Sequence, residues 1–505
     1  MASFAHKALD NDSLRQDSAW LVAILSPLLF SIVFVFALFS DFLPTYLGAY
    51  ADQRFLQAAV MLGVSLACLR SVSPSSSLTD LWFGIRPVLP IVAGFILLAV
   101  PFANNPYNWV EPGLFSLFFF TFAVLGWRFV ERSAVGVVTN LFIFLAAVAC
   151  FLYAAMTMTV YLFATTDRFA SLTDIIPWGF VNMRYWSHLA TWLLPLLPLA
   201  AQVGPLAQKR KWRWGVGFAA AIWWWIVFMT MARGTMISFF VACLIVGLVF
   251  RKHILAWLKI FLSHLLLGLI AWAVLSVAIP GLLFEEVAVR SLHAGSAGRL
   301  PLWQEAWIMS LANFPWGQGP QSWLTHELIL STDSVPKRFG HPHNMYLMWA
   351  AEYGWLLVFC LLFLVCVVFK KLFNRLEAVR GSVGQASTLA AFSVASIAGF
   401  AHAGVSAVFI VPASMLVGLC VLGLYWALLL ERKVPAKREA ETGQKEQAWI
   451  FHGLFLALLV AGAIWTYDVW RYHQAMVEDL VGYEQGPAVG TFPRFWFHGN
   501  FPRPD

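Results

Sequence analysis

The chain has 505 residues, of which 60% are hydrophobic and only 12% are charged, and its formal net charge is +7. This composition excludes an ordinary soluble domain and indicates a polytopic membrane protein built of helices, because backbone groups in a bilayer must satisfy their own hydrogen bonds. The positive charge implies no nucleic-acid partner, because the basic residues lie in short loops and form no stripe interleaved with aromatic residues.

Apolar segments along the chain predict twelve or thirteen transmembrane helices. Most of them approach the length of about 20 residues that a bilayer requires. No fixed repeat or inverted symmetry relates them. We therefore expect an all-α, polytopic fold. In chain order the segments are 20–40, 55–69, 87–103, 114–128, 135–165, 186–206, 215–232, 235–250, 254–280, 345–369, 386–406, 409–430 and 449–466.

Basic residues alternate between successive loops and predict the orientation of these helices. Residues 1–18 are polar and lack a cleavable signal pattern, so 20–40 is expected to be a retained first helix. By the positive-inside rule the basic loops face the cytoplasm, and the loops 104–113, 165–184 and 280–344 face outward. The basic loops fall at 7–15, 70–86, 128–132, 209–213, 251–252, 370–380 and 432–445.

These segments divide the chain into five parts. The longest outward loop is too long for a mere connector, and loops of that length usually carry function. We expect it to hold the catalytic residues. The parts are a cytoplasmic N-terminus (1–19), transmembrane helices 1–9 (20–280), the large outward loop (281–344), transmembrane helices 10–13 (345–466) and a C-terminal tail (467–505) whose Gly and Pro content predicts little regular structure.

Two features of the outward loop suggest local structure. Residues 302–313 predict an amphipathic helix at the membrane interface, with Trp303 and Trp307 on one face. Residues 314–320, Phe-Pro-Trp-Gly-Gln-Gly-Pro, predict a turn. Its glycines either serve the conformation of the turn or let backbone N–H groups approach a phosphate.

A polar stretch at 340–354 joins the end of this loop to the apolar segment 345–369. Pro342 suits the first turn of a helix and Asn344 suits its N-cap, so a helix is expected to begin here. The free N–H groups and the dipole of a helix start favour an anionic ligand. His343 would stand beside that ligand, held neutral and basic by nearby positive charge. The alternative is a histidine that only caps the helix.

Glu352 lies further along the same predicted helix. Asn344, Met348 and Glu352 recur at intervals of four and share one face, and Glu352 stands about 12 Å along the axis, at roughly 1.5 Å per residue. That distance prevents it from orienting His343 directly, so its partner should come from another helix. An ion pair between helices and a catalytic role are both open for an acidic residue inside a membrane helix.

Several arginines fall on the outward side, where positive charge is normally avoided. The planar guanidinium group binds phosphate through two parallel hydrogen bonds. A single such arginine is more often a lipid-headgroup or structural contact. Several that converge on a histidine at a helix start indicate a pyrophosphate site. These residues are Arg184, Arg233, Arg299 and Arg338.

A neutral histidine beside such an anion site predicts a transfer reaction. A group would leave a diphosphate and join an acceptor hydroxyl that His343 deprotonates, and a base of this kind contributes about 10² to 10⁴ in rate. No Asp-x-Asp pair or dense carboxylate cluster offers a site for a divalent cation. His341 and His343 are the alternative metal ligands, at a spacing that carries little weight alone. We expect a metal-independent reaction in which arginine takes the place of the metal.

Several short motifs, in this order and at these positions, resemble the O-antigen ligase and polymerase superfamily of bacterial inner-membrane glycosyltransferases. The resemblance covers the topology of most of the chain, and its specific motifs lie between residues 184 and 354. Those motifs are His343-Asn344-x-x-Leu347 followed by Glu352 and Gly354, Gly298-Arg299-Leu300 with Trp303, the turn from Pro315 to Gly319, and Arg233-Gly234.

The resemblance implies a glycan that is carried on undecaprenyl diphosphate and transferred in the periplasm without a nucleotide sugar or a metal. Ligases of this superfamily attach O-antigen to lipid A-core, polymerases extend it, and related protein O-oligosaccharyltransferases glycosylate proteins. The essential histidine of the superfamily corresponds to His343. Its arginines correspond to Arg184, Arg233, Arg299 and Arg338.

We therefore expect an O-antigen ligase of lipopolysaccharide biosynthesis, a multi-pass protein of the bacterial inner membrane whose active site and large loop face the periplasm. Its partners would be the undecaprenyl-diphosphate-linked glycan, the lipid A-core oligosaccharide and membrane lipids, and no cofactor is expected. The expected catalytic residues are His343, Arg299 and Arg233, supported by Glu352. The expected diphosphate-binding residues are Arg184, Arg233, Arg299, Arg338, His341 and Asn344.

Three alternatives stay open. The short C-terminal tail argues against a protein O-oligosaccharyltransferase, and the single dominant outward loop favours a ligase over a polymerase. A transporter of a lipid-linked anion would need polar groups near the membrane midplane. Asn140 and His264 are isolated candidates in mid-span, and His402 is expected at an outer turn. The concentration of polar groups on the outward side favours an enzyme.

Overall fold

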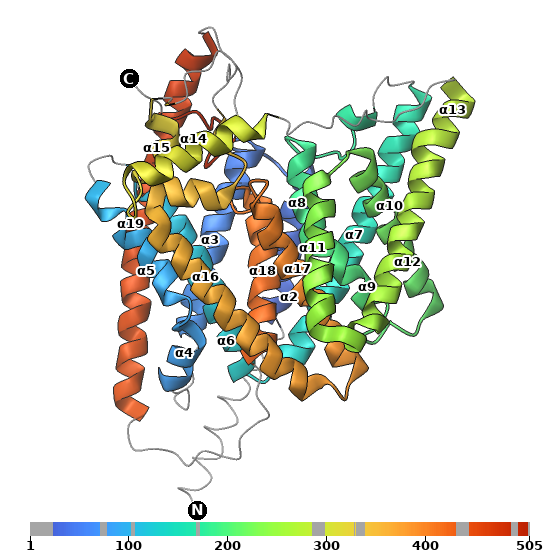
Figure 1. The fold of residues 1–505 in the computed structure, drawn as a ribbon, viewed down its shortest axis with the longest axis horizontal. Coiled ribbons are helices and arrows are strands. Elements are labelled where there is room, and N and C mark those ends of the chain that lie inside the picture. Colours follow the sequence, from blue (N-terminus) through green and yellow to red (C-terminus); the bar gives the residue numbers. More distant parts are fainter. Residues whose placement is uncertain are drawn as a thin grey trace, which may run out of the picture.

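The computed structural model describes residues 24–70, 78–102, 107–167, 172–284, 298–327, 329, 339–430, 444–485 and 493–502. All regular secondary structure in these residues is helical, and the long helices form one bundle (Figure 1). The prediction of an all-α, polytopic membrane protein is confirmed.

Most helices of the described residues are joined by short connections. The α-helices are α2 (Ser26–Leu38), α3 (Ala49–Arg70), α4 (Leu78–Ile85), α5 (Leu89–Leu97), α6 (Val110–Glu131), α7 (Val135–Thr166), α8 (Met183–Leu193), α9 (Leu197–Ala200), α10 (Arg210–Met229), α11 (Arg233–Phe250), α12 (Leu255–Trp272), α13 (Ile279–Phe284), α14 (Arg299–Ala312), α15 (Ser322–Thr325), α16 (Met345–Val379), α17 (Val383–Ala403), α18 (Pro412–Leu430) and α19 (Gln444–Gln485). Shorter 3₁₀ turns are η2 (Ser40–Phe42), η3 (Val100–Phe102), η4 (Leu172–Asp174), η5 (Leu194–Leu196) and η6 (Arg251–Ile254), and η7 (Ala273–Ala278) is a π-helical turn.

Seven helical stretches of the described residues are long and apolar enough to cross a membrane. An eighth is added if the pair 79–85 and 89–102, bent by 67°, counts as one broken span. Twelve or thirteen apolar segments were expected, and several of them are arranged differently. The seven stretches are 110–131, 135–166, 233–284, 345–379, 383–403, 412–430 and 449–483.

One of these differences has a clear physical cause. The expected span 186–206 is divided into α8, η5 and α9, because Pro195 and Pro198 remove backbone donors and break the regular hydrogen bonding. The expected span 235–250 corresponds to α11, and the expected span 254–280 corresponds to α12, η7 and the start of α13. They follow one another within the stretch 233–284.

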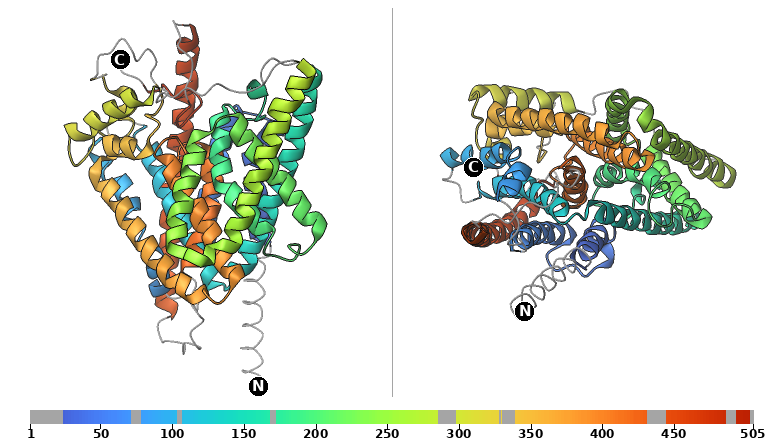
Figure 2. Two further views of the ribbon diagram at one scale, coloured as in Figure 1. Left: turned by 45° about the vertical axis from the view of Figure 1, so that its right-hand side comes forward. Right: turned by 90° about the horizontal axis from the view of Figure 1, so that it is seen from below.

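The core of the bundle is α18 together with α6. The apolar stretch of α18 is 94% buried and that of α6 is 83% buried, whereas only 11% of that of α19 is buried. Figures 1 and 2 accordingly place α18 inside the bundle and α19 at its edge. Small residues allow the close packing, because a Cβ atom at Gly126 would lie 2.7 Å from the carbonyl oxygen of Gly423. Helices at the edge expose their apolar side chains, as lipid contact requires.

A smaller layer covers the end of the bundle at which α16 begins. There α14 and α15 lie together across the start of α16 (Figure 1). Their contact is a separate apolar cluster that also includes Ala351 of α16, with Phe339 and Leu347 packed at its margin. The predicted amphipathic helix at 302–313 is thus observed as α14.

A break in α16 receives the turn that precedes α15. Gly354 has φ +83° and ψ 170° inside the helix, a conformation that only glycine adopts readily. A Cβ atom there would collide with the backbone of Pro315 and Trp316. The N–H of Gly319 donates to the carbonyl of Glu352 at 2.8 Å. The glycines of the turn therefore serve its conformation.

The end of the chain returns to the bundle. Residues 493–502 pack against α3 and α19, where Tyr472 donates its hydroxyl to the carbonyl of Phe501 at 2.8 Å. Arg54 of α3 donates from Nε to the carbonyl of Phe495 at 2.9 Å. The tail has more regular structure than expected, because α19 continues to Gln485 through residues without proline.

Candidate functional site

His343 lies at the start of α16, in the turn formed by residues 339–343. The side chain of Asn344 caps the helix by accepting hydrogen bonds from the N–H groups of Tyr346 and Leu347, at 3.1 and 3.0 Å. The predicted helix start is therefore confirmed. His343 itself has φ +57°, which is uncommon for a residue with a side chain, and backbone strain of this kind tends to cluster at functional sites.

Several contacts hold the turn in this conformation. The N–H of His343 donates to Nδ1 of His341 at 3.1 Å, and the two rings are 4.4 Å apart at 84°. Trp323 of α15 donates from Nε1 to the carbonyl of Phe339 at 2.9 Å, and the ring of Phe339 lies 5.4 Å from that of His343. His341 thus shapes the turn, whereas the imidazole of His343 makes no hydrogen bond to any side chain among the described residues.

Three of the predicted arginines lie in one region, where Arg184 and Arg233 are close to Arg299, and Arg184 and Arg299 are close to His343. Arg184 is the second residue of α8, and its N–H donates to the cap residue Asn182 at 2.9 Å. Arg233 is the first residue of α11, and Arg299 is the first residue of α14. Together with burial, the positive charges of Arg184 and Arg233 lower the pKa of Arg299, and those of Arg184 and Arg299 lower the pKa of His343.

The surroundings of Arg299 suit an anionic ligand. Gly298, with φ +73°, turns the chain so that α14 begins at Arg299. The Nε of Arg299 is buried, and no described residue accepts a hydrogen bond from it. Burial lowers the pKa of Arg299, and the charges of Arg184 and Arg233 lower it further. An anion bound between the three residues would relieve both the missing hydrogen bond and the repulsion.

The same surroundings set the charge state of His343. Burial lowers the pKa of His343 to about 3, with Arg184 and Arg299 as the contributing charges. Burial likewise lowers the pKa of His341, and the neighbouring His343 and Arg494 lower it further. His343 is therefore neutral at physiological pH, which is the form that accepts a proton.

Two further histidines complete this side of the site, and sequence reasoning missed one of them. His188 of α8 and His402 of α17 have ring centroids 5.0 Å apart. Nε2 of His188 is 2.8 Å from the hydroxyl of Ser406, and Nδ1 of His402 is 2.8 Å from that of Thr191. His188 lies inside a largely apolar segment. In the sequence only the preceding polar residues, Asn182 and Arg184, indicated that this segment belongs to the site.

A glycine makes room for His402. A Cβ atom at Gly234, next to Arg233, would lie 2.6 Å from Nε2 of His402. The second residue of the Arg233-Gly234 motif is therefore a glycine because a larger residue would collide with His402. His402 lies at the end of α17, as the expectation of an outer turn implied.

The match to known proteins coincides with this site. Residues 218–362 match the family model described as O-antigen ligase. This segment of the chain is similar to the O-antigen ligase family. The matched O-antigen ligase segment contains Arg233, Arg299 and His343, and Arg184 lies before it. The comparison with curated proteins found no match.

Outside the matched segment, Arg494 of the C-terminal residues 493–502 reaches a residue of that segment. Arg494 donates from Nη2 to both carboxylate oxygens of Glu352 at 2.7 Å, and from Nε to Glu111 of α6 at 2.9 Å. The N–H of Trp323 also donates to Glu352, at 3.2 Å. Glu352 therefore forms a buried ion pair, with a partner from the C-terminal segment instead of from another helix.

Arg494 also contacts the turn that carries His343. Its Nη1 donates to the carbonyl of Gly340 at 3.3 Å. Burial acts to lower the pKa of Arg494, yet the carboxylates of Glu111 and Glu352 raise it above its ordinary value, so the guanidinium stays charged. Glu352 acts on His343 only through this chain of contacts, which makes it a positioning residue.

The remaining candidates fall elsewhere. Arg338 lies outside the described residues. Asn140 is exposed on α7 and His264 is buried in α12, and neither contacts the site. Within the described part of the chain, no three His, Cys, Asp or Glu side chains gather in a way that would hold a metal ion.

Proposed function

We propose that this protein is an O-antigen ligase that transfers a glycan from undecaprenyl diphosphate to a sugar hydroxyl of lipid A-core at the periplasmic face of the bacterial inner membrane. The observation that carries the proposal is the neutral imidazole of His343, which has no hydrogen-bond partner among the described side chains and lies beside Arg184 and Arg299. This arrangement provides a base and an anion site on one side of the molecule, as a transfer from a diphosphate requires.

In the proposed reaction, His343 removes the proton from the acceptor hydroxyl. The acceptor oxygen forms a bond to the anomeric carbon of the donor sugar, and the bond from that carbon to the diphosphate oxygen breaks. The electron pair leaves with undecaprenyl diphosphate. The guanidinium groups of Arg184, Arg233 and Arg299 stabilise the charge that develops on it. The proton ends on His343, from which it passes to solvent.

Each residue of the site has a distinct part in this scheme. Arg299 has a buried Nε that lacks a partner among the described residues, so we assign it to the diphosphate oxygen nearest the broken bond. Arg184 and Arg233 are exposed and contact the outer oxygens. His341 and Asn344 fix the turn and the helix start, through which the dipole of α16 adds to the anion site.

The test uses the purified full-length protein with undecaprenyl-diphosphate-linked glycan, lipid A-core and EDTA. We expect a joined product on a gel, its loss in His343→Ala, and its retention in His253→Ala, a control in η6. Longer lipid-linked glycans in place of the joined product would assign a polymerase instead. Movement of the labelled lipid diphosphate across liposomes, without a new glycosidic bond, would assign a transporter.

A further inference from the structure

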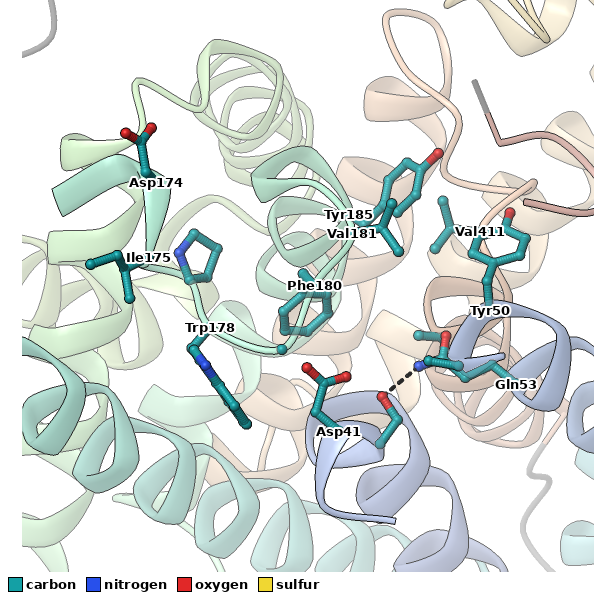
Figure 3. A pocket seen from close by; sticks show the side chains of 15 residues that line it. Asp41, Tyr50, Gln53, Asp174, Ile175, Trp178, Phe180, Val181, Tyr185 and Val411 are labelled. Carbon is teal, nitrogen blue, oxygen red and sulfur yellow. Dashed lines mark hydrogen bonds between the residues drawn. The ribbon is translucent and has the colours of Figure 1, made fainter. Parts of the chain in front are cut away.

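A cavity of about 500 Å³ lies between α3, α8 and the segments that precede them (Figure 3). We call it the α3–α8 cavity. Its walls are residues 40–53 on one side and residues 174–185 on the other, with Val411 and Ala413 at its end. This volume is within the usual range for a small-molecule site, about 300–1,000 Å³.

One wall of the α3–α8 cavity is aromatic and firmly held. Trp178 packs against Phe42 with ring centroids 5.2 Å apart, and its carbonyl accepts a hydrogen bond from Tyr153 at 2.9 Å. The ring of Phe180 lies 6.1 Å from that of Tyr153. Figure 3 shows Trp178 and Phe180 near Asp41, and a Cβ atom at Gly179, between them in sequence, would lie 3.7 Å from the carboxylate of Asp41. Such rings are flat apolar platforms in a fixed position.

The other wall provides polar groups. The carboxylate of Asp41 is exposed to the cavity and accepts no hydrogen bond from any described residue. Gln53 donates to Ser40 at 2.8 Å, which leaves its carbonyl oxygen as an acceptor. The hydroxyl groups of Tyr50 and Tyr185 stand at the far side of the cavity in Figure 3. The acceptor oxygens of Asp41 and Gln53 thus lie on the wall opposite Trp178 and Phe180.

The charge of the cavity distinguishes its ligand from a phosphate. Asp41 and Asp174 line it, and no Lys or Arg is among its lining residues. Two carboxylates would repel a diphosphate or an anionic lipid headgroup. Aromatic rings and carboxylates together suit a neutral ligand that has apolar faces and many hydroxyl groups. Its faces would stack on the rings, and its hydroxyl groups would donate to the carboxylates.

The α3–α8 cavity adjoins the candidate site. Tyr185, which lines it, directly follows Arg184, and its ring lies 5.9 Å from that of His188. The ring of Tyr50 is 6.3 Å from that of Tyr185, and its hydroxyl donates to the carbonyl of Arg494. A ligand that fills the cavity therefore ends beside the arginines and the histidines.

We propose that the α3–α8 cavity is a carbohydrate-binding subsite, in which a pyranose ring stacks on Trp178 and hydrogen-bonds to Asp41. The inference rests on the proposed function for its place in the reaction: the cavity holds a sugar of one substrate while the arginines hold the diphosphate. That sugar belongs either to the acceptor core or to the donor glycan, which share the same chemistry.

The first experiment measures binding without turnover. Full-length His343→Ala protein in phospholipid nanodiscs is titrated with two saccharide probes, the core oligosaccharide released from lipid A and the glycan released from its lipid diphosphate. Saturation-transfer NMR gives the dissociation constants. Adding Trp178→Ala should weaken one probe about tenfold, and adding Asp41→Asn about threefold, on the scale of one lost stacking contact or hydrogen bond.

Control variants test whether the effect is specific, and steady-state kinetics show whether the bound sugar belongs to the acceptor or to the donor. Trp82→Ala, an exposed tryptophan of α4, and Glu478→Gln, an exposed carboxylate of α19, should leave both dissociation constants unchanged. With His343 intact, Trp178→Ala and Asp41→Asn should raise KM for the acceptor alone or for the donor alone, with little change in kcat. The affected substrate is the one whose sugar occupies the cavity.

The outcomes separate this inference from the proposed function. Unchanged binding of both probes in Trp178→Ala and Asp41→Asn would overturn the subsite, even if the protein ligates. Binding only of phospholipid would also overturn it. Saccharide binding that depends on both residues, in a protein that forms no joined product, would retain the subsite and remove the ligase assignment. Thermal unfolding of each variant confirms that it is folded.

Discussion

Arg494 and Glu352 form an ion pair in which the guanidinium donates to both carboxylate oxygens. The pair joins residues 493–502 to α16, the helix that follows His343. Both contacts are 2.7 Å, and the two side chains are almost fully buried. Glu111 of α6 completes the arrangement from the opposite side, at 2.7 Å. One guanidinium thus links three segments that are distant in sequence.

Replacing Arg494 by methionine should destabilise the fold strongly. It would leave two buried carboxylates without a partner, and breaking a buried pair in this way costs about 3–5 kcal/mol. Thermal or denaturant unfolding in detergent measures the loss. The control is Arg380→Ala, which breaks an exposed pair with Glu377 and should change stability by less than about 1 kcal/mol. Equal effects of the two variants would contradict the structural role of Arg494.

The pH dependence of kcat/KM should lack the acid limb of an ordinary histidine. Burial, with Arg184 and Arg299, lowers the pKa of His343 to about 3, so the base stays neutral as the pH falls below 6.5. We expect kcat/KM to change little between about pH 5 and 7.5. An acid limb with an apparent pKa near 6.5 would contradict this environment for His343.

Removing one of the neighbouring charges should move that limb in a known direction. In Arg184→Gln, a positive charge that disfavours protonation of His343 is lost, so the pKa of His343 rises towards its ordinary value. The acid limb of kcat/KM should then shift to higher pH. Arg210→Gln, at the start of α10, is the matched control and should leave the profile in place.

Arg299 should contribute mainly to the transition state. If it stabilises the departing diphosphate, Arg299→Ala should lower kcat about 10²- to 10³-fold, as the loss of one such donor does in other enzymes. Arg299→Lys should recover only part of this, because lysine lacks the planar fork. Steady-state kinetics with the lipid-linked donor decide the point. A change in KM alone would make Arg299 a binding residue only.

Gly354 should tolerate no side chain. Gly354→Ala forces a Cβ atom against the backbone of Pro315 and Trp316 and imposes strain at φ +83°, so stability should fall by more than about 1 kcal/mol. Gly247→Ala, in open space within α11, is the control and should stabilise its helix by about 0.5–1 kcal/mol. Unfolding temperatures of the two variants should therefore move in opposite directions.

Local features were readable from the sequence because local interactions decide them. Long apolar segments predict membrane helices whatever their neighbours are, and Asn344 caps α16 through contacts two and three residues away. The helix expected at 302–313 is α14, which begins three residues earlier, at Arg299. The fold brings His343 and the three described arginines into one region, and the roles assigned to them stay a prediction.

Contacts between distant segments were decided only by the tertiary structure. His188 meets Ser406, and Glu352 meets Arg494, across 218 and 142 residues of chain. No periodicity encodes which faces of two helices cross, because that depends on how small residues such as Gly126 and Gly234 let neighbouring segments approach. The sequence by itself determined the membrane helices and the residues available for chemistry. Helix packing decided which histidines join His343, which cation neutralises Glu352, and where a cavity opens beside them.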